Sequence, residues 1–163
     1  MTTRPIAQGS GRYHVIVNNV TFVLQQHVRQ QGLGVVFPAG LGYMMNDPHG
    51  QMLVPDGSFV HTDNLRADWD LDEPYPGIPD LALEVVVDSS DELMRRKLQI
   101  YMDNGVSQVW ILRLRAQSVY QYTHDRIGHM TSYNAGDRIN TSALFPNLHV
   151  TVNDIFEMPD WVL

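Results

Sequence analysis

Residues 81–114 read LALEVVVDSSDELMRRKLQIYMDNGVSQVWILRL, and this stretch decides the fold. It opens with a nearly unbroken apolar run, Leu81–Val87, which is typical of a strand covered on both faces. A Ser-x-x-Glu capping box at 89–92 then predicts a helix that runs to Asn104-Gly105. A second apolar run, Val109–Leu114, predicts another strand. Strand, helix and strand together form a crossover unit, in which the two strands are parallel.

The segments before this unit favour one helix and a hairpin. Tyr13–Gln31 spaces its apolar residues three to five apart and is followed by Gly32, which predicts a helix with a glycine cap. Residues 34–45 and 51–61 read as extended segments, and the turn formers at 46–50 between them predict a hairpin.

The remaining segments are expected to be peripheral. Residues 62–79 carry three prolines and a run of acidic residues, which predicts an exposed loop. Val119–Thr123 is expected to pair as a hairpin with the second strand of the crossover. The tail, Ser142–Phe156, reads as a loop followed by a short strand or turn. The expected fold class is α/β with an α+β-like character, a mixed sheet flanked by helices.

Length and composition restrict the protein class. At 163 residues, with 44% hydrophobic residues, the chain is expected to form one domain, 1–163. The absence of cysteine excludes disulfides, thiolate catalysis and Cys-based zinc sites. No stretch approaches the roughly twenty apolar residues that a membrane span needs. A cytoplasmic location without membrane contact is the resulting expectation.

The charge is unevenly distributed. The net charge is −7, yet residues 1–46 carry three arginines and no acidic residue, so that segment is +3 and the rest of the chain is −10. A protein that holds phosphates usually presents a basic surface. Contacts with phosphate are therefore expected from the amino-terminal segment or from Arg95-Arg96-Lys97. The asymmetry also fits a chain whose loops simply carry its acidic residues.

Glu84 is the first candidate for chemistry. An ionised carboxylate in a buried strand is costly unless it is paired or binds a metal. Asp56 lies on a neighbouring predicted strand about 5 Å away, so the two carboxylates can meet across the sheet. Lys97, the only lysine of the chain, shares a helix face with Tyr101 and can reach the same place. Carboxylates with an ammonium group suit a divalent metal and a phosphate.

Simpler interpretations remain open. Glu84 can be held by a structural ion pair with one of the ten arginines, and a lone lysine is most often solvated. Asp80 is about 13 Å along the strand from Glu84, too far to share an ion with it. His61 and Asp63 form the best remaining cluster, a weak one. The sequence shows no glycine-rich phosphate loop and no Gly-x-Ser-x-Gly elbow.

Taken together, these motifs resemble a known family. The residues that carry the resemblance are Pro55-Asp56, Pro79-Asp80-Leu81-Ala82-Leu83-Glu84-Val85, Arg96-Lys97, Tyr101, Gly105-Val106, Val109-Trp110-Ile111 and Phe145-Pro146-Asn147-Leu148. In order and spacing, over roughly residues 12–157, they are similar to the Uma-two family of putative restriction endonucleases. That family belongs to the PD-(D/E)XK nuclease superfamily, so the resemblance implies a restriction-endonuclease-like sheet and cleavage of DNA.

The resemblance also implies roles for individual residues. Asp56 and Glu84 would bind Mg²⁺ or Mn²⁺, with the main-chain carbonyl of Val85 as a further ligand. Lys97 would serve as the motif lysine and stabilise negative charge. Tyr101 would support the site or contact a phosphate, and Arg96 would contact the substrate. The implied catalytic set is therefore Asp56, Glu84 and Lys97, and a homodimer is the expected assembly.

Two departures leave alternatives open. The plain superfamily pattern has lysine where this chain has Val86, and the family carries an additional amino-terminal acid, whereas this chain has no Asp or Glu before Asp47. A catalytically silent nuclease-fold module that dimerises or binds a protein partner is the main alternative. An enzyme acting on a small phosphorylated molecule is a weaker one.

Overall fold

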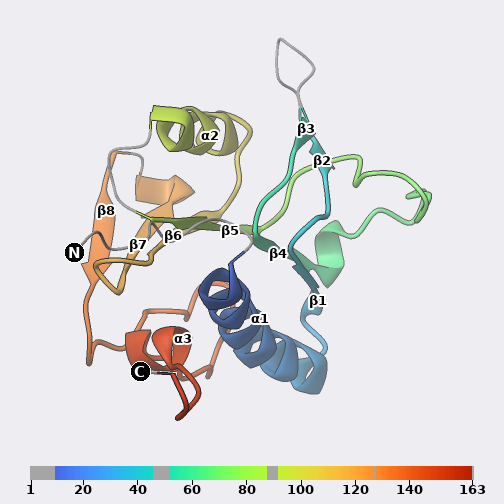
Figure 1. Cartoon of the computed structure of the whole chain (residues 1–163). Helices are drawn as coiled ribbons and strands as arrows, with labels where there is room; N and C mark the ends of the chain where they lie inside the picture. The colour runs from blue at the N-terminus through green and yellow to red at the C-terminus, as the bar shows by residue number, and fades with distance from the viewer. Residues whose placement is uncertain (1–9, 46–51, 88–91, 127, 163) are drawn as a thin grey trace.

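The computed structural model describes residues 10–45, 52–87, 92–126 and 128–162 (Figure 1). Six strands form a sheet in the order β1-β4-β5-β6-β7-β8, and β2 and β3 form a separate pair. The helices are α1 (Gly11–Gln31), α2 (Glu92–Asp103) and α3 (Val152–Phe156), with 3₁₀ turns η1 (Thr62–Asn64) and η2 (His124–Arg126). The strands are β1 (Gly34–Pro38), β2 (Tyr43–Met44), β3 (Met52–Leu53), β4 (Gly57–His61), β5 (Leu81–Val86), β6 (Gln108–Arg113), β7 (Ser118–Thr123) and β8 (Met130–Tyr133).

The crossover unit forms as predicted. β5 and β6 are parallel, with Leu81 opposite Gln108 and Val86 opposite Arg113, and α2 connects them. All six residues of β5 are buried, as the unbroken apolar run indicated. The other neighbours in the sheet are antiparallel, so the sheet is mixed, which confirms the expected fold class.

Helices cover both faces of this sheet. α1 and α3 lie on one face and α2 lies on the other (Figure 1). Alternate residues of β5 and β6 divide between the two cores, because successive side chains of a strand point to opposite faces. Leu83, Val85 and Trp110 pack on the α1 side, whereas Ala82 and Ile111 pack on the α2 side.

α1 forms because its apolar residues recur every three or four positions along one face. The buried ones are Tyr13, Ile16, Val17, Val20, Leu24 and Val28. The Ser10 side chain accepts a hydrogen bond from the Tyr13 amide, 3.3 Å away, and so caps the amino terminus. Gly32 ends the helix at φ 63° and donates its amide to the Val28 carbonyl. This left-handed conformation confirms the predicted glycine cap.

Other expectations need correction. The hairpin expected over 34–61 is divided into two ladders, β1 with β4 and β2 with β3, and its turn lies outside the described residues. The capping box at 89–92 also falls largely outside them, since 88–91 are not described. The tail is a loop over 142–150, as predicted, but its end was wrong: residues 152–156 form α3 and not a strand or turn, and its cap is a reciprocal pair of hydrogen bonds between Thr151 and Asp154. β8 was not predicted at all.

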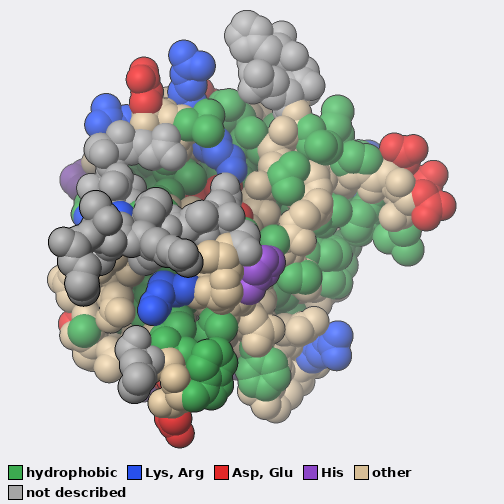
Figure 2. Space-filling model, in the orientation of Figure 1, with side chains coloured by type: hydrophobic (Ala, Val, Ile, Leu, Met, Phe, Trp, Pro, Cys, Tyr) green, Lys and Arg blue, Asp and Glu red, His purple; other side chains and the backbone are tan. Residues whose placement is uncertain are grey.

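The acidic segment 62–79 behaves as predicted after its initial turn η1. It projects from the body of the protein, with red side chains at its tip (Figure 2). Arg66 is tied to Asp68 within the loop, with 3.0 Å between guanidinium nitrogen and carboxylate oxygen. No helix among the described residues is both long enough and apolar enough to cross a bilayer.

Gly34 provides a test of the β1–β4 pairing. Its φ is 150°, and a Cβ there would lie 2.1 Å from the Val60 carbonyl oxygen. Gly34→Ala should therefore lower the free energy of unfolding by roughly 2–3 kcal/mol, measured by urea denaturation. Gly11→Ala is the control, since its Cβ would meet nothing within 4 Å. Equal stability of the two variants would show that β1 does not approach β4 this closely.

Candidate active site

Lys97 and Glu84 form the centre of the site. The Lys97 Nζ atom is 2.6 Å from Glu84 Oε1 and 2.8 Å from Oε2. Tyr101 donates its hydroxyl to Oε1 over 2.9 Å. The Glu84 side chain is 1% exposed and that of Lys97 is 21% exposed. An arginine partner for Glu84 was the simpler alternative at the sequence level, and the structure has Lys97 in that place.

The local sequence explains why these three side chains meet. Lys97 and Tyr101 are four apart on α2, so they extend from the same face of the helix. The crossover connection lays α2 across the face of the sheet to which Glu84 points. Tyr101 is fully buried in the α2-side core, which fixes the rotation of the helix and with it the direction of Lys97.

Asp56 lies directly before β4, not within a longer strand as the sequence indicated. Its amide donates to the Leu83 carbonyl over 2.9 Å, and its Oδ2 accepts from the Val85 amide over 2.8 Å. The Asp56 side chain therefore accepts the hydrogen bond of a β5 amide just beyond the residues of β5 that pair with β4. Tyr13, from α1, donates its hydroxyl to Asp56 Oδ1.

The two carboxylates approach the same end of β5 from different directions. Glu84 points to the α2 side, while Asp56 lies beside the edge of β5 and is contacted from the α1 side by Tyr13. Their charges still interact, and the charge of Asp56 is one cause of the raised pKa of Glu84. Sequence reasoning expected a simple meeting across one face of the sheet.

The main chain of Val85 faces the same edge as Asp56. The Val86 carbonyl accepts from the Leu114 amide at the β6 end of the sheet. Neighbouring residues of a strand direct their amide and carbonyl groups to opposite edges. The Val85 carbonyl therefore points toward β4, the direction in which its amide meets Asp56.

Burial raises the pKa of Glu84 from 4.5 to about 7, and the nearby charge of Asp56 adds to this rise. The Lys97 ammonium and the Tyr101 hydroxyl oppose it, since both stabilise the carboxylate. The pKa of Tyr101 is also raised, by burial and by the charge of Glu84. A carboxyl group whose pKa lies near neutrality is typical of functional sites.

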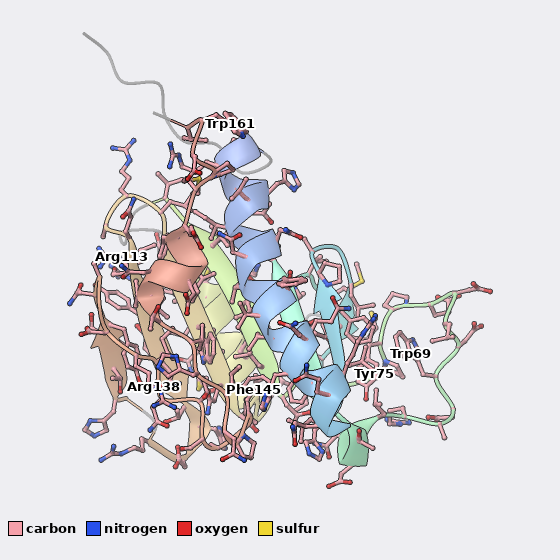
Figure 3. The ribbon with its side chains drawn as sticks, turned by 90° about the horizontal axis from the view of Figure 1, so that it is seen from below. Trp69, Tyr75, Arg113, Arg138, Phe145 and Trp161 are labelled. Atoms are coloured by element: carbon pink, nitrogen blue, oxygen red, sulfur yellow. The ribbon has the colours of Figure 1, made fainter. Side chains whose placement is uncertain are left out.

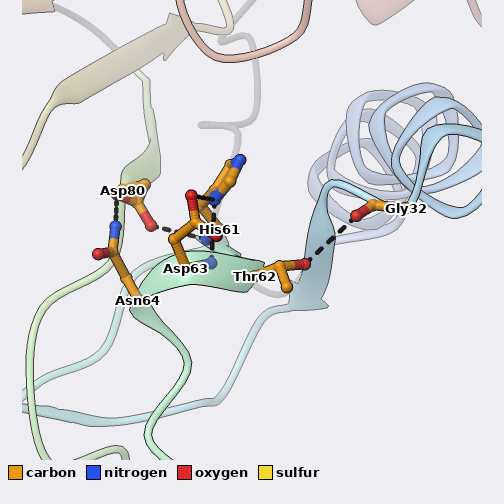
Figure 4. Close-up of polar contacts among 6 residues, drawn as sticks. All are labelled: Gly32, His61, Thr62, Asp63, Asn64 and Asp80. Atoms are coloured by element: carbon orange, nitrogen blue, oxygen red, sulfur yellow. Dashed lines mark hydrogen bonds and ion pairs between the residues drawn. The ribbon is translucent and has the colours of Figure 1, made fainter.

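The other candidates lie elsewhere. Arg96 is exposed on α2. Asp80 accepts from the His61 amide at 2.7 Å and from Asn64 at 2.8 Å, so it stabilises the turn η1 that follows β4 (Figure 4). His61 and Asp63 contact each other within that turn. No group of three or more His, Asp or Glu side chains suited to a metal occurs in the parts of the chain that the structure describes.

Tyr13 is a site residue that sequence reasoning missed. It is 5% exposed and joins α1 to Asp56, forty-three positions further along the chain. Its hydroxyl is the polar group that distinguishes it from the aliphatic residues on this helix face, Ile16, Val17 and Val20. A polar tip on an otherwise aliphatic stripe was therefore the available signal, because buried tyrosine hydroxyls need a partner.

Tyr13→Phe should remove the α1 contact with Asp56. Loss of a hydrogen bond to a charged group should lower the free energy of unfolding by about 1.5–3 kcal/mol. Thermal or urea unfolding measures this change. Tyr122→Phe is the matched control, since the half-buried Tyr122 hydroxyl has no hydrogen bond among the described residues. Asp56→Asn combined with Tyr13→Phe forms a double-mutant cycle. Additive effects in the cycle would show that the two residues do not interact.

The raised pKa of Glu84 predicts a pH dependence of stability. In metal-free protein, Glu84 binds its proton more tightly when folded than when unfolded. The contribution of Glu84 to the free energy of unfolding is therefore fully present below pH 4.5 and is lost as the pH rises through about 7. Glu84→Gln should flatten this part of the unfolding free-energy profile, measured in EDTA. Glu92→Gln, an exposed change on α2, should keep the wild-type profile. An unchanged profile in Glu84→Gln would refute the assignment.

Comparisons with known proteins agree with this architecture. The family model described as putative restriction endonuclease matches residues 4–153. A crystal structure of a putative nuclease belonging to DUF820 from Anabaena variabilis ATCC 29413 has a similar fold, with a TM-score of 0.74. The two share 17% identity over 95% of this chain and 84% of that one. Among curated proteins no match is found. Because its model spans nearly the whole sequence, the chain belongs to the Uma-two family of putative restriction endonucleases.

Proposed function

We propose that this protein is a metal-dependent endonuclease that hydrolyses phosphodiester bonds in DNA, with Mg²⁺ or Mn²⁺ as its cofactor. One observation carries the proposal. Lys97 meets Glu84 inside the protein, beside Asp56, at one end of β5. Membership of a family described as putative restriction endonuclease supports the same reaction.

The residues present suit a magnesium ion. Mg²⁺ binds one or two carboxylates and keeps several waters, so it does not require a dense cluster of acidic side chains. Asp56 and Glu84 supply two carboxylates, and the Val85 carbonyl points to the same edge of β5 as Asp56. A bound divalent ion supplies a Lewis acid for the phosphate and an activated water. For Glu84 to be a ligand, at least one of its oxygens must exchange Lys97 for the ion.

The protein groups then have separate roles. Lys97 presents a positive charge where negative charge develops on the phosphate. Tyr13 and Tyr101 are positioning residues, since each donates its hydroxyl to one of the carboxylates and is itself buried. Arg95 and Arg96 extend the positive charge along the exposed side of α2, over which blue side chains are visible (Figure 2).

The alternative is a catalytically silent module that acts through dimerisation or a protein partner. It is favoured by the completeness of the hydrogen bonding, since both oxygens of Glu84 and both of Asp56 already have donors from the protein. The net charge of −7 also opposes binding to a polyanion.

Metal titration and plasmid nicking distinguish these functions. Calorimetry should show Mn²⁺ binding to the wild type and its loss in Asp56→Asn and Glu84→Gln, while Asp103→Asn on exposed α2 keeps it. Lys97→Ala should retain binding but reduce nicking about 100-fold or more, because a group that stabilises the transition state is missing.

Arg138→Ala is the control for Lys97→Ala, since it removes an exposed positive charge outside the proposed site. Folded wild-type protein that neither binds Mn²⁺ nor nicks DNA would reject the endonuclease. Light scattering on that sample would then test for the dimer, one of the two ways in which the silent module would act.

A further inference from the structure

Arg113 shares the face of the sheet on which Glu84 lies. Leu112 and Leu114, its neighbours on the chain, pack in the α1-side core, whereas Ile111 packs in the α2-side core. Because side chains alternate along a strand, Arg113 extends to the α2 side. It is a residue of β6 opposite Val86 of β5. Its Cα is therefore about 8 Å from that of Glu84, one strand across and two residues along.

The guanidinium group is anchored from the β7 side. Arg113 Nη1 donates to the Tyr120 hydroxyl at 2.6 Å and to Ser118 Oγ at 3.2 Å. The Arg113 Cζ atom is 4.5 Å from the centroid of the Tyr120 ring. The cation–π contact and the two hydrogen bonds that Nη1 donates hold the guanidinium group in a defined position.

These contacts leave another part of the group unused. Arg113 Nε is buried and has no hydrogen-bond partner, the one such side-chain atom among the residues that the structure describes. Among the described residues, the hydrogen bonds of this side chain all involve Nη1, and no carboxylate forms an ion pair with it. A buried donor without an acceptor is destabilising, so its retention needs an explanation.

The chemistry of the unused edge indicates the kind of ligand. Nε and Nη2 form the side of a guanidinium group that donates two parallel hydrogen bonds to a phosphate or carboxylate. Ser118 and Tyr120 engage the other nitrogen. Because the Arg113 side chain is only half-buried, a phosphate can approach this edge at Nη2, with Nε at its buried end. The nearby acidic pair, Asp56 and Glu84, makes a carboxylate ligand less favourable here than a phosphodiester that accompanies a metal ion.

We propose that Arg113 holds a backbone phosphate of the DNA adjacent to the phosphate that is cleaved. The proposal rests on the proposed function, and it adds a fixed contact outside the Asp56, Glu84 and Lys97 set. Arg113 lies well apart from Arg138, an exposed arginine beside β8 that serves as the comparison (Figure 3). Both residues contribute one positive charge, but only Arg113 is on the face of Glu84.

The experiment measures DNA affinity against salt concentration. A short fluorescent DNA duplex is titrated with the wild type, Arg113→Gln, Arg113→Lys and Arg138→Gln, with Ca²⁺ in place of Mg²⁺, and anisotropy is followed. Loss of one phosphate contact reduces the slope of log affinity against log salt by about 0.9. Between about 50 and 200 mM salt, wild-type affinity should fall three- to fourfold more than that of Arg113→Gln.

Arg138→Gln should keep the wild-type slope. Arg113→Lys should keep the slope as well, because the charge remains, but bind more weakly since the paired donors are lost. Thermal melting of each variant confirms that it is folded.

An Arg113→Gln slope equal to that of the wild type would overturn this inference and leave the endonuclease intact, with Arg113 as a packing partner of Tyr120. A wild type that does not bind the duplex at any salt concentration would overturn both proposals. A reduced slope in a protein that never nicks DNA would support Arg113 as a phosphate contact and would reject only the catalytic part of the proposed function.

Discussion

The structure of the site depends on the burial of Glu84. A carboxylate that is 1% exposed is strongly destabilised as an anion, and here Lys97, Tyr101 and the fold around them compensate. Compensation works only at the position and rotation that α2 has, because Lys97 and Tyr101 must both reach Glu84 from the same helix face. The crossover connection and the burial of Tyr101 together place Lys97 where it compensates this one buried charge.

Sequence reasoning predicted the central part of the fold well. The capped α1, the parallel pair β5 and β6 and the return strand β7 follow from local periodicity and turn residues, because each pattern is contained within a short window. It failed for α3 and β8. The α3 helix has five residues, too few for a repeating pattern, and three of the four residues of β8 are exposed, so no apolar alternation marks it.

The site was predictable to a similar degree. The pairing of Glu84 with Lys97 was predictable, because Glu84 is a charged residue within an apolar run and the helix geometry directs Lys97 toward it. The position of Asp56 did not follow, because the sequence does not reveal that β4 begins only at Gly57, which leaves Asp56 just outside the strand and in contact with β5. Tyr13 and the unpaired Nε of Arg113 were also out of reach, since both are properties of contacts between distant segments.

Asp56 combines two roles in one side chain. Its carboxylate takes the position of a missing strand partner for Val85, and so it maintains the fork where β4 and β5 separate. The space in which chemistry is proposed is thus a gap in the pairing of the sheet, kept open by one of the proposed ligands. A lineage that gave up the reaction would therefore still be selected to keep this aspartate, and its presence in a relative is weak evidence that the relative is an active enzyme.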